Sequence, residues 1–328
     1  MTETERPAAA VLAEAAEAAG YAPSVHNTQP WRWRVAGDIL DLHAVRERQL
    51  RVADPEGRLL TISCGTALHH ALVALATEGW SAEVTPLPDP ADADHLARVR
   101  LTGRVGVTPE AMRLFQAVRL RHTDRRPVSE TPAGEEALAA VERAVRAEGV
   151  QSHLLTGDQI LELAAAASHA DQVETEDEEQ VTELAYWIGG DRPEGAGIPD
   201  AVIPSRAPET TVPGRDFVRA GTLTVGPGHD RAARYAVIYG PGDEPADWLR
   251  AGAAVSAGWL VATEHGVTVL PFSSVVELPT TRRQLREMIS NVGYPYLVLR
   301  LGTADPETAG PPHTPRLPAA QTIEVVRE

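Results

Sequence analysis

The sequence contains no lysine. Its 328 residues carry a formal net charge of −16, so arginine supplies every fixed cationic side chain in an acidic protein. An anionic ligand would therefore have to be bound by arginine, backbone N–H groups or histidine. The negative charge also argues against a nucleic-acid partner, because binding phosphate backbones requires a basic face that releases counterions.

Cysteine is nearly absent as well. The single Cys64 cannot form an internal disulfide and has no second thiol with which to hold a metal ion. It stands in an apolar segment, which favours a buried structural thiol over a nucleophile. We identify no metal-binding spacing and no Ser-His-Asp pattern, so neither a metal site nor hydrolysis is predicted.

The chain also lacks the marks of export. Residues 1–5 are acidic, unlike the cationic start of a signal peptide, and we expect no apolar run long enough to span a membrane. We predict a soluble cytoplasmic protein with no membrane partner. The length leaves two domains or one large fused fold open.

Periodicity predicts a mixture of helices and strands. A hairpin is expected at 31–43, where two alternating segments flank a Gly-Asp turn. The acidic run 174–179 is interpreted as a solvated helix start. Other helices are expected at 12–20, 59–77, 109–119, 131–149, 157–171, 248–263 and 281–289, and other strands at 82–87, 95–102, 234–239, 267–270 and 296–301.

Two segments repeat each other. Residues 65–87 and 252–272 each show an apolar helix that opens near a first glycine, with Ser63 or Thr66 as a cap in the first copy. Each helix ends in Thr-Glu before a second glycine, Gly79 or Gly266, and runs into a strand closed by proline. We infer one fold written twice, with halves at 1–108 and 109–328 that pack as a pseudo-dimer and hold a ligand between them.

The halves differ in two polar segments. The decapeptide at 22–31 concentrates Ser, His, Asn, Thr and Gln between two prolines, which fits a ligand-holding loop or an ordinary helix-to-strand turn equally well. The second half has no counterpart of it. The basic segment 119–126 has no counterpart before the first half, so one complete site of two is predicted.

These motifs, together with Leu-Pro-Phe-Ser-Ser at 270–274 and Leu-Val-Leu-Arg-Leu-Gly at 297–302, resemble the nitroreductase-like FMN flavoproteins. The closer resemblance is to the Acg family of actinobacterial FMN-binding proteins, in which two such halves are fused. It covers nearly the whole chain. The resemblance implies a tandem nitroreductase-like α+β fold and one FMN per chain.

The resemblance also implies which residues bind the cofactor. Ser24, Asn27 and Gln29 belong to the flavin-contacting loop, and Arg121, Thr123, Arg125 and Arg300 would hold the FMN phosphate. Pro271, Phe272, Ser273 and Ser274 would lie near the flavin N5 side. Independently of the family, alternating arginines with a hydroxyl between them suit a phosphate dianion. A solvated basic stretch remains the alternative for Arg121 and Arg125, and an Asp or Glu partner the alternative for Arg300. No proton transfer is assigned to His26.

The implied activity is NAD(P)H-dependent reduction of nitroaromatics or quinones. Because no Rossmann glycine fingerprint follows a strand, NAD(P)H would bind only transiently as electron donor. Residues 189–217, here called the lid loop, are predicted to cover the site, with a surface insertion as the alternative. A closed lid supports a second hypothesis, a protein that stores or sequesters flavin. We expect a monomeric pseudo-dimer or a weak homo-oligomer that acts on a small molecule.

Overall fold

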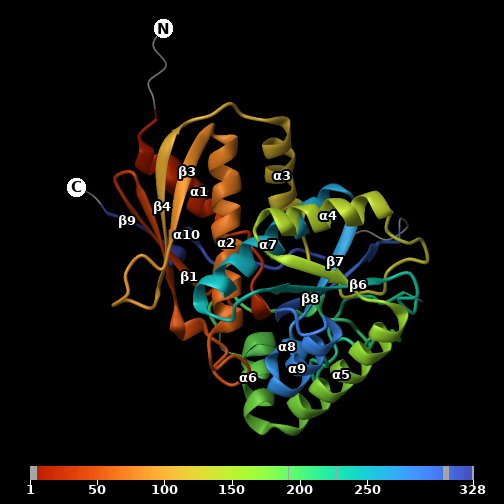
Figure 1. Ribbon diagram of the computed structural model, residues 1–328. Helices are drawn as coiled ribbons and strands as arrows, with labels where there is room; N and C mark the ends of the chain where they lie inside the picture. The colour runs from red at the N-terminus through yellow and green to blue at the C-terminus, as the bar shows by residue number, and fades with distance from the viewer. Residues whose placement is uncertain (1–5, 191, 227, 306–309, 327–328) are drawn as a thin grey trace.

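The structure is a computed structural model that describes residues 6–190, 192–226, 228–305 and 310–326 (Figure 1). Its first half contains α1 (Ala8–Ala19), β1 (Trp31–Ala36), β2 (Ile39–Ala44), α2 (Arg58–Thr77), β3 (Trp80–Pro86), β4 (His95–Arg104) and then the connecting helix α3 (Pro109–Leu120). The second half contains α4 (Glu135–Ala147), β5 (Gln151–Leu154), α5 (Gly157–Glu176), α6 (Glu178–Gly189), β6 (Arg234–Gly240), α7 (Pro245–Glu264), β7 (Val267–Phe272), α8 (Ser274–Glu277), α9 (Pro279–Met288) and β8 (Tyr294–Thr303). The chain ends with α10 (Ala319–Thr322) and β9 (Ile323–Val325).

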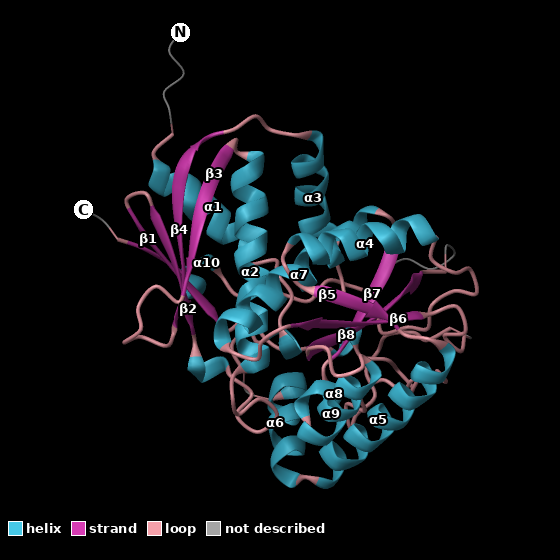
Figure 2. Cartoon of the chain, in the orientation of Figure 1, coloured by secondary structure: helices cyan, strands magenta, loops and turns pink. Residues whose placement is uncertain are grey.

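The two halves have sheets of the same strand order. The first sheet runs β3-β4-β2-β1-β9 and the second runs β5-β6-β8-β7. Without β9, each strand of one sheet has a counterpart at the same place in the other, and the pairs within each half are antiparallel. Figure 2 shows the two sheets at opposite sides of the molecule with α2 and α7 between them. The predicted α+β fold of two similar halves is confirmed.

The repeated glycines mark where the halves meet. A Cβ atom on Gly65 would lie 2.0 Å from the Leu249 carbonyl oxygen, and one on Gly252 would lie 2.0 Å from the Ile62 oxygen. Helices α2 and α7 therefore cross at a point where only glycine fits. Both glycines lie inside 20-residue helices. Their predicted position near the helix starts was wrong.

The predicted caps on α2 were also wrong. The Ser63 hydroxyl donates to the Leu59 carbonyl at 2.6 Å and the Thr66 hydroxyl to the Ser63 carbonyl at 2.7 Å, both within the helix. The helix starts earlier, after Gly57 in the left-handed conformation. The predicted stops were right: Gly79 and Gly266 follow the helices at φ of 71° and 68°.

Helix α2 is long and apolar enough to cross a membrane by length and composition alone. Our expectation that no such run exists was wrong, because residues 59–77 contain no charged side chain. In the structure most of this helix is buried, packed against α1, α3 and α7. Its apolar character is that of a core helix.

The second half carries an insertion between β5 and β6, where the first half has only the Gly37-Asp38 turn. The insertion holds α5, α6 and the lid loop. Helix α6 and the lid loop pack around an apolar cluster of their own, formed by Leu184, Ile188, Ile198, Val202, Ile203 and Phe217. The interpretation of 174–179 as a solvated helix start was wrong for Glu174, which ends up buried in α5 beside Arg215. It holds for Asp177, which caps α6 by accepting from the N–H groups of Glu179 and Gln180.

The C-terminal segment returns to the first half. Strand β9 pairs in parallel with β1, with Ile323 opposite Trp33. To reach that position, residues 310–318 run back along the boundary between the halves. A division of the chain at residue 108 does not account for β9, and those domain limits stay a prediction.

Candidate functional site

One cavity of about 680 Å³ lies where the two halves and the lid loop meet. Its walls come from the decapeptide, the start of α2, the 121–125 segment, α7, the end of β7, the lid loop and the C-terminal segment. This volume is in the range of small-molecule and cofactor sites. Segments far apart in the chain thus converge on a single site.

Ten of the eleven residues predicted to bind a cofactor line this cavity: Ser24, Asn27, Arg121, Thr123, Arg125, Pro271, Phe272, Ser273, Ser274 and Arg300. Gln29 does not. Its buried amide donates to the Gly195 carbonyl at 2.8 Å and accepts from the Leu317 N–H at 2.9 Å. Gln29 therefore ties the decapeptide to the lid loop and the C-terminal segment from outside the cavity.

The decapeptide is held in a conformation that an ordinary turn would not require. His26, Asn27 and Gln29 have φ values of 45°, 55° and 48°, a region that non-glycine residues seldom occupy. Hydroxyls of α2 support it, because Ser63 accepts from the Val25 N–H at 3.1 Å and Thr66 donates to the Pro23 carbonyl at 2.6 Å. The loop lies in the cavity wall, where a ligand-holding role stays a prediction.

Asn27 connects three walls of the cavity. Its amide donates to the Gly197 and Pro315 carbonyls, both at 3.0 Å, and its oxygen accepts from Arg316 at 3.2 Å. Asn27 is 7% exposed. These bonds fix the lid loop and the C-terminal segment to the decapeptide.

Three arginines in the cavity wall lack a carboxylate partner: the buried Arg121 and the half-buried Arg125 and Arg316. Among the described residues, no Asp or Glu lies within ion-pair distance of Arg121, Arg125 or Arg316. Burial and the charge of Arg316 hold the pKa of Arg121 well below its usual range. Burial lowers the pKa of Arg125 to about 10 and that of Arg316 to about 10. Three arginines without an ion-pair partner in the wall of one cavity, one of them buried, suit an anionic ligand.

The hydrogen bonds of these arginines are incomplete. Arg121 donates one bond to the Tyr21 carbonyl at 3.1 Å and lies 4.6 Å from the Trp259 ring centroid. Arg125 donates to the Val202 carbonyl at 3.3 Å and lies over Phe217. The Nε atoms of Arg121 and Arg316 are buried without any partner. Donors of this kind suit the oxygens of a phosphate group.

Sequence reasoning missed Arg316. The proline-rich segment around it was interpreted only as a tail that cannot form helix. The one available signal was an arginine between Pro315 and Leu317-Pro318 in a chain without lysine. Only the return of this segment to the first sheet brings Arg316 next to Arg121.

Arg300 and Arg215 are paired. Arg300 binds Asp230 at 2.8 Å and donates to the carbonyls of Asp124 and Arg126, so the competing explanation, a carboxylate partner, is the one observed. The effect is to hold the 121–126 segment in position. Arg215 of the lid loop lies between Glu174, at 3.1 Å, and Glu277.

Burial shifts the pKa of two further groups, His26 in the cavity wall and Cys64 outside it. Burial, with Arg215 and Arg125 nearby, holds the pKa of His26 well below its usual range, so His26 is uncharged at neutral pH. Burial raises the pKa of the Cys64 thiol, which donates to the Pro30 carbonyl at 3.2 Å. Cys64 is therefore the buried structural thiol that the sequence predicted.

Comparisons with known proteins agree with this picture. No family model matches the chain. Two relatives from Mycobacterium tuberculosis bear names of the form "Putative NAD(P)H nitroreductase". One, Rv3131, is 40% identical over 92% of this chain and 88% of its own length; the other, acg, is 32% identical over 96% of both chains.

Solved structures show a weaker likeness. A nitroreductase with bound FMN from Desulfitobacterium hafniense matches 66% of this chain and 98% of its own at 13% identity and a TM-score of 0.40. One from Bacteroides fragilis, also with bound FMN, matches 65% and 98% at 14% identity and a TM-score of 0.38. Likenesses at this level carry no argument about the site.

The duplicated α+β fold, with one cavity where its halves meet, defines a nitroreductase-like protein of double length. At the identity and coverage of its mycobacterial relatives, the chain belongs to the Acg family of such proteins.

Proposed function

We propose that this protein binds FMN in the central cavity and acts as an NAD(P)H-dependent oxidoreductase on small nitroaromatics or quinones. The observation that carries the proposal is the group of three cavity-lining arginines without carboxylate partners, Arg121, Arg125 and Arg316, two of them with a buried, unpartnered Nε. A phosphate dianion would supply the missing charge and acceptors. The names of the mycobacterial relatives support the redox activity.

Different residues of the cavity wall would bind different parts of FMN. Arg121, Arg125 and Arg316, with the Thr123 hydroxyl, would hold the phosphate. Ser24 and Asn27 on one side and Pro271–Ser274 on the other would bound the ring system. When bound, the flavin supplies the hydride and electron transfer; the protein supplies orientation, charge and exclusion of water.

Storage of flavin is the second candidate function. The lid loop contributes Ile198, Val202, Ile203 and further residues up to Arg215 to the cavity wall, and Phe217 lies against Arg125. The two buried carboxylates around Arg215 fasten this loop to α5 and α8. A fastened lid favours retention of the cofactor over exchange of bulky substrates.

The spectrum and redox behaviour of the purified protein test both candidates. An oxidoreductase should be yellow, bleach when NADPH is added without oxygen, and recover its colour with nitrofurazone or menadione. A storage protein should keep its colour with NADPH and bleach only with dithionite. A colourless protein that does not take up added FMN would contradict both.

The double substitution Arg121→Ala, Arg125→Ala tests the phosphate assignment. We expect a folded protein that has lost FMN, because two of the three cations are removed. Arg283→Ala is the matched control, since this arginine is exposed on α9, away from the cavity. Retention of FMN by the double variant would rule the assignment out.

Two further predictions accompany the proposed function. A cytoplasmic location is consistent with a nicotinamide electron donor. A single chain already contains both halves, so size-exclusion chromatography with light scattering should show a monomeric pseudo-dimer or a weak homo-oligomer.

A further inference from the structure

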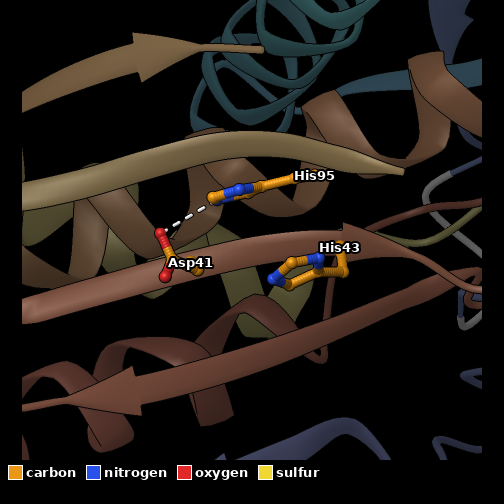
Figure 3. Close-up of side chains that lie close together, drawn as sticks. All are labelled: Asp41, His43 and His95. Carbon is orange, nitrogen blue, oxygen red and sulfur yellow. Dashed lines mark hydrogen bonds and ion pairs between the residues drawn. The ribbon is translucent and has the colours of Figure 1, made fainter. Parts of the chain in front are cut away.

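A second cluster of ligand-type side chains lies on the outer face of the first sheet. Asp41 and His43 belong to β2, and His95 begins β4 (Figure 3). Their neighbours Leu40 and Leu42 point into the apolar core with α2, so by alternation Asp41 and His43 face the other way. None of the three lines the cavity.

An irregularity in the strand pairing brings the two histidines together. The register between β2 and β4 shifts after Leu42, so Ala97 stands opposite Leu42 but His95 stands opposite His43. In a regular ladder Leu96 would occupy that place; instead Leu96 is buried in the core. Bulges commonly re-aim a side chain at a functional site. Here the bulge places the His95 imidazole, in place of the Leu96 side chain, beside His43.

The three side chains converge. One ligand atom from each lies within 4.8 Å of those from the other two. The His95 Nε2 and the Asp41 Oδ1 are 2.9 Å apart, as the dashed line in Figure 3 shows. The two imidazole rings stack with centroids 4.5 Å apart and planes inclined by 19°.

We propose that Asp41, His43 and His95 bind a divalent transition-metal ion of the Zn²⁺ type. Two imidazoles and one carboxylate are a recurrent ligand set for such ions, with water in the remaining position. Metal–ligand bonds of about 2.0–2.2 Å place ligand atoms about 3.3–3.5 Å apart in a tetrahedral site. The ligand atoms lie within 4.8 Å of one another, so metal binding would require the side chains to rotate out of the observed ring stacking until their lone pairs converge on the ion.

A neighbouring carboxylate and the exposure of His43 fit the proposal. The Asp92 carboxylate lies 3.8 Å from the His43 Nδ1, where a carboxylate would orient the ring and leave its other nitrogen for the metal. The His43 side chain is 29% exposed, so an ion can enter from solvent.

In this structure the Arg98 guanidinium binds the Asp41 carboxylate that would otherwise bind the metal ion. Its Nε lies 2.8 Å from Asp41 Oδ1 and its Nη2 3.2 Å from Oδ2. The side chain is 39% exposed and can turn outward. The guanidinium therefore competes with the metal ion for the same carboxylate. A bound ion would cross-link β2 to β4 and stabilise the folded state.

Isothermal titration of the untagged, chelator-treated protein with Zn²⁺ tests the site. We expect one ion per chain, a higher Tm in the presence of Zn²⁺, and a visible absorption band when Co²⁺ replaces it. His43 is half-buried. The variant His43→Gln should bind Zn²⁺ more than about 100-fold more weakly, since even the loss of a residue that only supports a ligand lowers metal affinity about 10- to 100-fold. The control His265→Gln removes an exposed histidine elsewhere and should change nothing.

Arg98→Gln separates a metal site from a purely structural network. Removing the competing cation should tighten Zn²⁺ binding by about tenfold. A structural role alone predicts no such gain. Absence of one-to-one binding, equal binding by wild type and His43→Gln, or weaker binding by Arg98→Gln would each overturn the proposal.

Discussion

The cavity wall contains two groups of arginines in opposite electrostatic situations. Arg300 and Arg215 lie beside carboxylates, whereas Arg121, Arg125 and Arg316 lie beside aromatic rings, backbone carbonyls or one another. The same side chain therefore serves two purposes within one cavity. The paired arginines are neutralised by carboxylates of the protein, whereas the unpaired arginines would gain a counter-charge from the anionic ligand proposed above.

The largest effect is expected from breaking a pair. Arg300→Met leaves Asp230 buried without its partner and frees the Asp124 and Arg126 carbonyls. The free energy of unfolding should fall by about 3–5 kcal/mol, measured by urea denaturation. The double variant Arg300→Met, Asp230→Leu should recover part of the loss, because the stranded charge is gone. Equal stability of wild type and Arg300→Met would show that the paired arginines do not contribute more to stability than the unpaired ones.

The next effect separates binding from stability. Arg121→Met removes an uncompensated buried charge, so the unfolding free energy of the flavin-free protein should change by less than about 1 kcal/mol or rise. FMN affinity should fall by about 10- to 150-fold, the value of a charge-assisted hydrogen bond of 1.5–3 kcal/mol. Riboflavin, which lacks the phosphate, should bind wild type and variant alike. Parallel losses of FMN and riboflavin affinity would place the arginine elsewhere on the ligand.

Sequence reasoning reached the fold because the signals of the fold are local and repeated. The glycine pairs, the Thr-Glu endings and the alternating strands each lie within a few residues of one another, and the structure repeats them in two sheets of the same order. The significance of Gly65 and Gly252 could not be found in this way. Their contact joins residues from different halves, and a contact between helices leaves no periodicity in either one.

From the sequence, cavity-lining residues could be predicted only where they stand in a recognisable motif. Ser24, Arg121 and Thr123 were found in polar segments that stand out from their surroundings. Gln29 stands in the same decapeptide, but its side chain binds the Gly195 carbonyl and the Leu317 N–H outside the cavity, and both partners are far away in the sequence. The partner of Arg300 is 70 positions away, at Asp230, and no local pattern indicates it.

A third, smaller effect concerns the paired group and pH. Burial raises the pKa of Glu174 to about 7, with Glu277 adding to the rise and Arg215 opposing it. The folded protein thus keeps a proton on Glu174 that the unfolded chain releases near its ordinary pKa. The stabilisation is complete at the acid end of this range and is lost as pH rises through about 7.

Glu174→Gln should abolish that part of the pH dependence. Between pH 5 and pH 8 the wild type should lose about 2 kcal/mol of unfolding free energy that the variant does not lose. Urea denaturation at both pH values measures it, and Glu176→Gln, exposed at the end of the same helix, is the control. Identical pH profiles for Glu174→Gln and wild type would show that protonation of Glu174 does not contribute to the stability of the folded protein.

The smallest effect tests geometry at constant charge. Arg316→Lys keeps the cation but loses the planar fork, whose Nη1 reaches Asn27 and whose Nη2 reaches the Tyr21 carbonyl. FMN affinity should fall by about tenfold, with riboflavin affinity unchanged, since one directed contact to the phosphate is replaced by a mobile point charge. Fluorescence quenching of each flavin gives both constants. Should the variant bind FMN as wild type does, charge alone would suffice at this position, and the unpaired arginines would act as a diffuse positive field without a fixed arrangement of donors.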